Sequence, residues 1–181
     1  MKTIQLKEFI KTGKFGTISI GSTKADILNL LGNKYELHEA EETQIIRYGW
    51  YEFFFYTETE TVFGIQNDHL LADCTNHKEM ISLGNSRCTM DTWFIQENKN
   101  ISFAQVEDYL HKEGIPFTIE PSYKGSSWNV IECSESKVRF DFADEYRTVN
   151  LNKKGKFIGW TEHTETDQSR FLLNGIRLFN R

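Results

Sequence analysis

The sequence predicts an α+β fold made of two tandem α-β-β-β units, with antiparallel sheets and with the helices packed on one face. Two segments, 22–31 and 102–113, each begin at a serine or threonine, carry apolar residues at helical spacing and stop at a glycine. Each is followed by several short runs of β-branched and aromatic residues. An Ile-Ser pair opens both helix regions, at 18 and at 101, so the order of elements favours a repeat.

The first unit is predicted over residues 1–97, with an N-terminal extension and an additional strand. Ser22 or Thr23 caps its helix, and Asp26 lies in the first turn. The strands that follow are expected to form a meander and are "TQIIRYGW", "YEFFFYTE" and "ETVFGIQND". The segment "RCTMDTWFI" is expected to place one more strand beside this first sheet.

The second unit is predicted over residues 98–181. Its helix is followed by the strand patterns "IPFTIE", "WNVIEC", "KVRFDF" and "RTVNLNKKGKFIGW", and "NKKGK" is typical of a turn between two strand ends. In the last segment, "DQSRFLLNGIRLFNR", apolar residues recur near helical spacing. We expect a C-terminal helix packed on the sheets, with a homodimer or partner contact through that helix as the alternative.

The stretch "YGWYEFFFY", residues 48–56, is the most aromatic part of the chain. Alternate residues of a strand face opposite sides, so Tyr51, Phe53 and Phe55 are expected on one face and Glu52, Phe54 and Tyr56 on the other. The simpler interpretation is a central strand covered on both faces. The alternative is an exposed aromatic patch, for which Tyr48, Trp50 and Tyr56 are the best members because their polar ends tolerate water.

Composition and charge limit the partners. The 181 residues carry a formal net charge of −5 with a pI near 5.6. This disfavours a nucleic-acid binder, which needs a basic face, and favours a basic protein partner. Three cysteines without C-x-x-C spacing indicate reduced thiols. With no apolar run of signal or membrane-span length, we expect a cytoplasmic protein that binds no membrane and no cofactor.

The segment "IGSTKADILNLLG" resembles the G-[MS]-T-x-x-[DEQ]-V-x-x-x-L-G pattern of small bacterial α+β proteins, among them outer-membrane assembly lipoproteins related to tandem-repeat β-lactamase-inhibitor proteins. The following "IIRYGWYEFFF" resembles the YG-x-x-EF-x-F strand of uncharacterised intracellular bacterial proteins. The matching positions are Gly21, Thr23, Asp26, Ile27, Leu31 and Gly32. The resemblance covers about residues 16 to 66 and implies a scaffold used for binding, without catalytic residues.

Three groups of residues could carry chemistry. His69, Asp73 and His77 would share one face if helical, as in a zinc site. Glu132, Glu135 and Lys137, near Asp141, faintly resemble the acidic-plus-lysine cluster of a metal-dependent nuclease. A cysteine nucleophile would need a histidine beside it; the candidates are Cys74 or Cys133 with His111 or His163. These groups make a small-molecule or metal-dependent enzyme, with its site between the two units, the alternative function.

The leading hypothesis is a non-enzymatic protein-binding protein, most concretely an immunity-type inhibitor that covers a basic toxin domain. It rests on acidic loops beside aromatic residues and on the lack of a catalytic motif. A structural dimerisation module is a third hypothesis. The predicted partner-binding residues are Tyr48, Trp50, Tyr56, Glu39, Glu41, Glu42, Trp128, Asp144 and Glu145.

Overall fold

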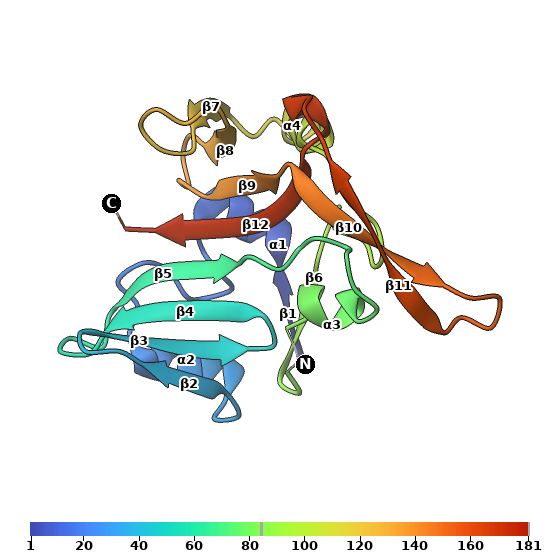
Figure 1. Cartoon of the computed structure of the whole chain (residues 1–181). Coiled ribbons are helices and arrows are strands. Elements are labelled where there is room, and N and C mark those ends of the chain that lie inside the picture. The colour runs from blue at the N-terminus through green and yellow to red at the C-terminus, as the bar shows by residue number, and fades with distance from the viewer. Residues whose placement is uncertain (84, 181) are drawn as a thin grey trace.

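The computed structural model describes residues 1–83 and 85–180, and it confirms the α+β class. Gly84 and Arg181, one in each predicted unit, lie outside the described residues. Within the described part of the chain, eight strands form one antiparallel sheet in the spatial order β2-β3-β4-β5-β12-β9-β8-β7 (Figure 1). They are β2 (Glu36–Glu39), β3 (Thr43–Tyr48), β4 (Tyr51–Tyr56), β5 (Val62–Asn67), β7 (Phe117–Pro121), β8 (Asn129–Cys133), β9 (Arg139–Ala143) and β12 (Leu172–Phe179).

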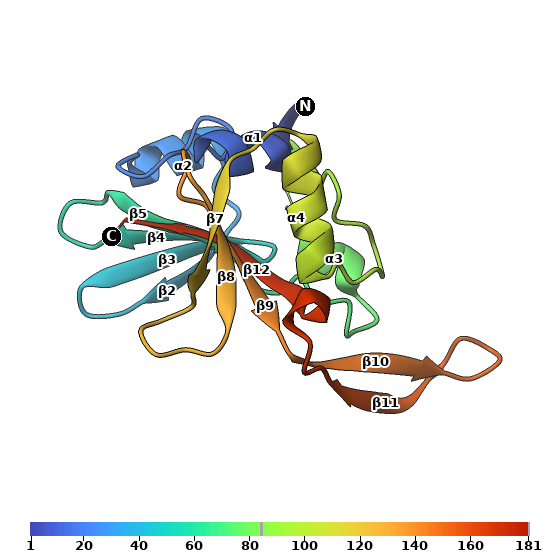
Figure 2. The same cartoon turned by 90° about the horizontal axis from the view of Figure 1, so that it is seen from above.

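The helices are α1 (Leu6–Thr12), α2 (Lys24–Leu31), α3 (His77–Ile81) and α4 (Phe103–Lys112). Figure 2 shows α1, α2 and α4 on one face of the sheet. Both predicted helix starts are confirmed. Thr23 caps α2 in a capping box with Asp26, and Ser102 caps α4 in the same way with Gln105. The side-chain hydroxyls satisfy backbone N–H groups that the first helical turn leaves unpaired.

The two predicted units share one continuous sheet. In the first half α2 precedes β2, β3, β4 and β5, and in the second half α4 precedes β7, β8, β9 and β12. The halves meet where β5 pairs with β12, with Gln66 opposite Arg177. Each half therefore holds one more sheet strand than the predicted α-β-β-β order. A duplication of the units stays a prediction.

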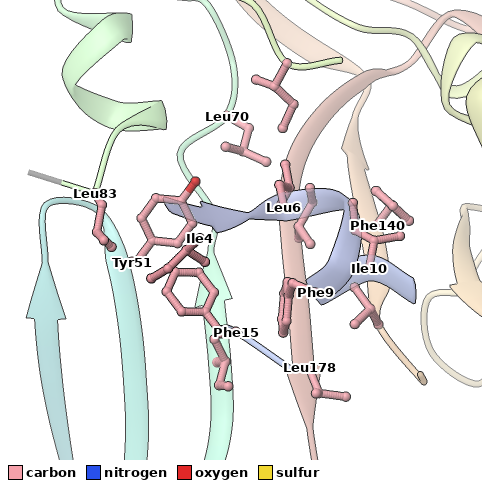
Figure 3. Close-up of a cluster of buried hydrophobic side chains, with 14 of the residues drawn as sticks. Ile4, Leu6, Phe9, Ile10, Phe15, Tyr51, Leu70, Leu83, Phe140 and Leu178 are labelled. Atoms are coloured by element: carbon pink, nitrogen blue, oxygen red, sulfur yellow. The ribbon is translucent and has the colours of Figure 1, made fainter. Parts of the chain in front are cut away.

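The N-terminal extension joins the halves on the helix side. Figure 3 shows Phe9 and Ile10 of α1 beside Phe140 and Leu178 of the second half, whereas Phe15 lies beside Tyr51 of the first. The ring centroids of Phe15 and Tyr51 are 5.4 Å apart. These side chains belong to a single buried cluster that draws on both halves. The fold is therefore stabilised by one shared core.

The predicted C-terminal helix is wrong. Residues 172–179 form β12, and only the short 3₁₀ turn η1 (Gln168–Arg170) precedes it. Burial alternates with the period of a strand, because Leu173 and Leu178 face the core while Arg177 and Phe179 are half-buried on the other side. Pairing with β5 and β9, both distant in sequence, outweighs the local helical spacing. A dimer through a C-terminal helix loses its structural basis.

The additional strand of the first unit is also placed differently. Residues of "RCTMDTWFI" form β6 (Cys88–Asp91), which pairs in parallel with β1 (Lys2–Gln5). This pair is a separate two-stranded sheet, so it does not extend the first half of the main sheet as expected. The buried side chains of Ile4 and Cys88 fix its position, because they join the shared core.

A long hairpin leaves the main sheet between β9 and β12. It consists of β10 (Glu145–Leu151) and β11 (Phe157–Thr164), which pair only with each other. In Figures 1 and 2 the hairpin extends away from the rest of the molecule. The predicted turn at "NKKGK" is confirmed, with Gly155 in the left-handed region at φ 74°.

Candidate functional site

Figure 2 shows α1, α2 and α4 on one face of the main sheet. The other face carries the alternate side chains of each strand, those that point away from the helices. On β4, Phe53 and Phe55 are fully buried on the helix side. Glu52 and Phe54 point the other way and are half-buried, and Tyr56 is exposed. The predicted alternation along "YEFFFY" is therefore confirmed, and β4 is a central strand. We call the face opposite the helices the open face. Because α1, α2 and α4 do not cover it, it can serve as a binding surface.

Four aromatic rings gather at one end of the open face. The rings of Tyr56 and Phe63 stack with their centroids 4.5 Å apart, and the ring centroids of Phe54 and Phe179 are 5.1 Å apart. Phe63 is the extra residue where the β4–β5 register shifts. A Cβ atom on Gly64 would lie 2.3 Å from the Phe179 ring, so this glycine allows the ring to rest on the backbone.

Two acidic turns lie at the same end of the sheet as these rings. The β2–β3 and β4–β5 turns lie side by side, because the Thr57 amide donates to the Glu42 carbonyl. Figure 1 shows both turns at the same end of the sheet as the C-terminal end of β12. Four exposed carboxylates come from the two turns: Glu41, Glu42, Glu58 and Glu60. We call these glutamates together with Phe54, Tyr56, Phe63 and Phe179 the acidic aromatic corner.

The middle of the open face carries paired charges. The Arg177 Nε atom lies 2.5 Å from an Asp141 carboxylate oxygen, and Arg139 Nε lies 3.3 Å from Glu132. Burial raises the pKa of Asp141, while Arg177 and Arg139 act in the opposite direction. Further along the same row, the Gln66 amide donates to Glu52 at 2.7 Å. Because each arginine is matched by a carboxylate, this region contributes little net charge to the surface.

The predicted partner-binding residues do not form one surface. Tyr56, Glu41 and Glu42 come together in the acidic aromatic corner. Glu39 lies on the helix side of the sheet instead, because it pairs with Gln44, which in turn pairs with the buried Phe55. Trp50 lies in the β3–β4 turn at the opposite end of these strands, where it packs 4.2 Å from His69 and under Arg47.

The prediction that Tyr48 belongs to an exposed aromatic patch is wrong. It is 2% exposed, and its hydroxyl donates to the Gly32 carbonyl. Burial raises the pKa of Tyr48 to about 12. The physical reason is register: Tyr48 pairs with Tyr51 across a two-residue turn, so it shares the core face of that residue.

The remaining members lie elsewhere. Trp128 is 48% exposed in the loop before β8, near the other edge of the sheet, and Asp144 and Glu145 lie at the base of the β10–β11 hairpin. Sequence reasoning missed Phe63 and Phe179. The β-bulge hid the orientation of Phe63, and the predicted helix hid that of Phe179.

The residues considered for metal binding or catalysis are engaged in other contacts. His77 is fully buried; its Nε2 atom lies 3.0 Å from the Leu70 carbonyl, and its Nδ1 accepts from the Asn98 amide. His69 lies beside Asp68. Among the described residues, no three His, Cys, Asp or Glu side chains are placed to hold a metal ion.

The cysteine thiols are poorly suited to act as nucleophiles. Burial raises the pKa of Cys74, and it raises the pKa of Cys133 to about 12. A nucleophilic cysteine needs the opposite shift, because the thiolate is the reactive form. His163, one of the proposed bases, stacks on Tyr146 and lies 2.9 Å from the Thr148 hydroxyl.

Comparisons with known proteins found no matching family model, no matching curated protein and no matching solved structure. In the described part of the chain, no helix is both long and apolar enough to cross a membrane.

Proposed function

We propose that this is a non-enzymatic binding protein whose acidic aromatic corner contacts a basic protein partner. The observation that carries the proposal is the position of four aromatic rings beside two acidic turns on a sheet face without helices. Protein interfaces commonly have an aromatic centre and a polar rim. Here Tyr56, which is 45% exposed, offers an anchor of the kind that dominates binding energy.

The glutamates add selectivity to this anchor. Glu41, Glu42, Glu58 and Glu60 are all exposed, so their charges act on an approaching molecule through solvent. Such a field speeds the encounter with a basic surface and repels an acidic one. A hollow of about 490 Å³ lies at the end of β12, and Phe179 borders it, but Thr12, Gly13 and Leu178 line it from the helix side.

The finer form of this proposal is an immunity-type inhibitor that covers the active cleft of a basic toxin domain. Acidic side chains would occupy the place of a phosphate-rich substrate. It is supported by the charge of the corner and by the resemblance of the first half to binding scaffolds. Its test is co-expression with the product of a neighbouring gene. Protection of growth that disappears when Glu41, Glu42 and Glu58 are replaced by glutamine supports it, and failure to protect against any adjacent toxin refutes it.

The binding proposal itself is tested with a displayed random peptide library. Immobilised protein is expected to enrich peptides that combine Lys or Arg with aromatic residues. The triple variant Glu41→Gln, Glu42→Gln and Glu58→Gln is expected to lose most of this enrichment, because the substitutions remove charge and keep side-chain size.

The matched control is Glu8→Gln, Asp108→Asn and Glu135→Gln, which removes the same charge at exposed positions on other elements. It is expected to enrich the same peptides as the wild type. Equal loss in both variants would show a general charge effect and would contradict a localised site. Enrichment without a preference for basic residues would contradict the proposal as a whole.

A further inference from the structure

The β10–β11 hairpin carries an unusual concentration of exposed apolar side chains. Leu151, Phe157, Ile158 and Trp160 are 51%, 47%, 65% and 53% exposed. A two-stranded hairpin without further cover is only marginally stable in water. An exposed apolar cluster of this kind marks an interaction site.

The register gathers Leu151, Phe157 and Trp160 on one side of the hairpin. Val149 is opposite Trp160 and Leu151 is opposite Phe157, while Ile158 is the extra residue of a bulge. The rings of Phe157 and Trp160 meet edge to face at 4.6 Å, and the Arg147 guanidinium lies 5.2 Å from the Trp160 centroid. These contacts hold the aromatic side chains in place before any partner binds.

The hairpin is also locally basic, although the chain carries a net charge of −5. Its turn holds three exposed lysines: Lys153, Lys154 and Lys156. The turn is well defined, because the Asn152 side chain accepts hydrogen bonds from the amides of Lys154 and Lys156 at 2.8 and 3.0 Å. With Arg147, four cations border the apolar side chains, and they outnumber the one exposed carboxylate on the same side next to Trp160, that of Glu162 opposite Arg147. We call this surface the basic hairpin.

The basic hairpin and the acidic aromatic corner are complementary in two respects. Each has aromatic side chains at its centre, and the charges around them have opposite sign. Both views show the hairpin and the corner at opposite ends of the molecule (Figures 1 and 2). A hairpin therefore cannot cover the corner of its own chain.

We propose that the basic hairpin of one copy docks on the acidic aromatic corner of a second copy. This inference rests on the proposed function in that the same corner is the receiving surface. Contact between two hairpins is disfavoured, since it would bring their lysines together. Self-association would also compete with the basic partner, so that the corner is shielded until a tighter ligand displaces the second copy.

The test is sedimentation velocity over a roughly hundredfold range of protein concentration. The wild type is expected to associate at about 0.05 M salt and to dissociate at about 0.5 M, since salt screens exposed charges. The hairpin variant is Lys153→Glu, Lys154→Glu and Lys156→Glu, and the corner variant is Glu41→Lys, Glu42→Lys and Glu58→Lys. Each variant alone is expected to be monomeric, because its hairpin and corner then have the same sign.

Mixing the two variants is the decisive step. The acidic hairpin of one now matches the basic corner of the other, and the second hairpin–corner pair is complementary as well. The mixture is expected to associate at least tenfold more strongly than either variant alone, which corresponds to about 1.4 kcal/mol. A monomeric mixture overturns the inference, and so does a wild type that stays monomeric or a hairpin variant that still associates. Unchanged thermal unfolding of both variants shows that they are folded.

Two further measurements separate the alternatives. Co-sedimentation of the monomeric wild type with phosphatidylserine vesicles, lost in the hairpin variant, would assign the hairpin to an anionic membrane and overturn docking between copies. The hairpin variant keeps an unaltered corner and is expected to enrich basic peptides like the wild type. If it does so while self-association fails, only the present inference is lost. If it enriches none while the wild type self-associates, the proposed function is lost instead.

Discussion

Two antiparallel ribbons of this chain have similar chemistry and opposite surroundings. The β3–β4 ribbon and the β10–β11 hairpin are both rich in aromatic and β-branched residues. In the first, Phe53 and Phe55 are fully buried beneath the helices, and in the second Trp160 is 53% exposed. The ribbons differ in their neighbours, since β3 and β4 lie within an eight-stranded sheet and β10 and β11 pair only with each other. The comparison teaches that strand chemistry alone does not decide between core and contact surface.

The largest expected effect is in the buried ribbon. Replacing Phe53 by alanine removes a fully buried ring that packs edge to face on the ring of Phe15, with the two centroids 5.3 Å apart. We expect a loss of about 3 to 5 kcal/mol in the free energy of unfolding, because a cavity is left in the core. Denaturant titration measures this loss. A loss similar to that of a hairpin substitution would show that the two ribbons are equally exposed in solution.

The next effect concerns the aromatic cluster of the open face. Gly64→Ala is expected to cost about 1 to 3 kcal/mol, because the new methyl group meets the Phe179 ring and forces it aside. In a Phe179→Ala background the same change is expected to cost much less, since the ring is absent. A double-mutant cycle by urea unfolding checks this coupling. Additive effects would mean that Phe179 does not rest on Gly64.

A smaller effect is expected at Tyr48. Tyr48→Phe leaves the buried Gly32 carbonyl without its hydroxyl donor and is expected to cost about 1 kcal/mol.

The dependence of the free energy of unfolding on pH provides a second test of Tyr48. The folded pKa of Tyr48 is raised to about 12 from the ordinary 10.0, so the unfolded state loses its proton first as pH rises. The wild type is therefore expected to lose stability between about pH 10 and 12. Tyr48→Phe should lose less over this range, though buried Tyr51 keeps part of the slope because burial raises its pKa too. Identical slopes in both proteins would contradict a buried phenol at position 48.

The smallest effect on stability belongs to the hairpin. Ile158 is 65% exposed, and Ile158→Ser is expected to change the free energy of unfolding by no more than about 0.5 kcal/mol. If the β10–β11 hairpin is a contact surface, the same substitution should weaken self-association in sedimentation experiments. Strong destabilisation without a change in association would show that Ile158 stabilises the fold and is not part of a contact surface.

Sequence reasoning was most successful where the signals are local. The caps at Thr23 and Ser102, the strands around "YEFFFY" and the turn at "NKKGK" follow from short-range hydrogen bonding and from alternation. The placement of Tyr48 failed because the alternation was not carried across the two-residue turn to Tyr51, although the register of such a hairpin was a usable signal.

The remaining errors concern contacts between distant segments. Leu172, Ile176 and Phe179 suit both a helix and a strand, and pairing with β5 and β9 decides the outcome. The acidic side of the candidate site was predicted in part, through Glu41, Glu42 and Tyr56, whereas Glu39 lies on the helix side. Its aromatic centre depends on Phe63 and Phe179, which come together only when β5 and β12 pair.

The central position of β12 has a consequence for biosynthesis. A ribosome makes this strand after every other strand of the main sheet, yet it joins the two halves. Until it emerges, β5 and β9 each present an open hydrogen-bonding edge, and such edges invite pairing with other nascent chains. The first half can form its meander early, but completion of the sheet waits for the last strand, so cells making this protein would benefit from a chaperone that shields those edges.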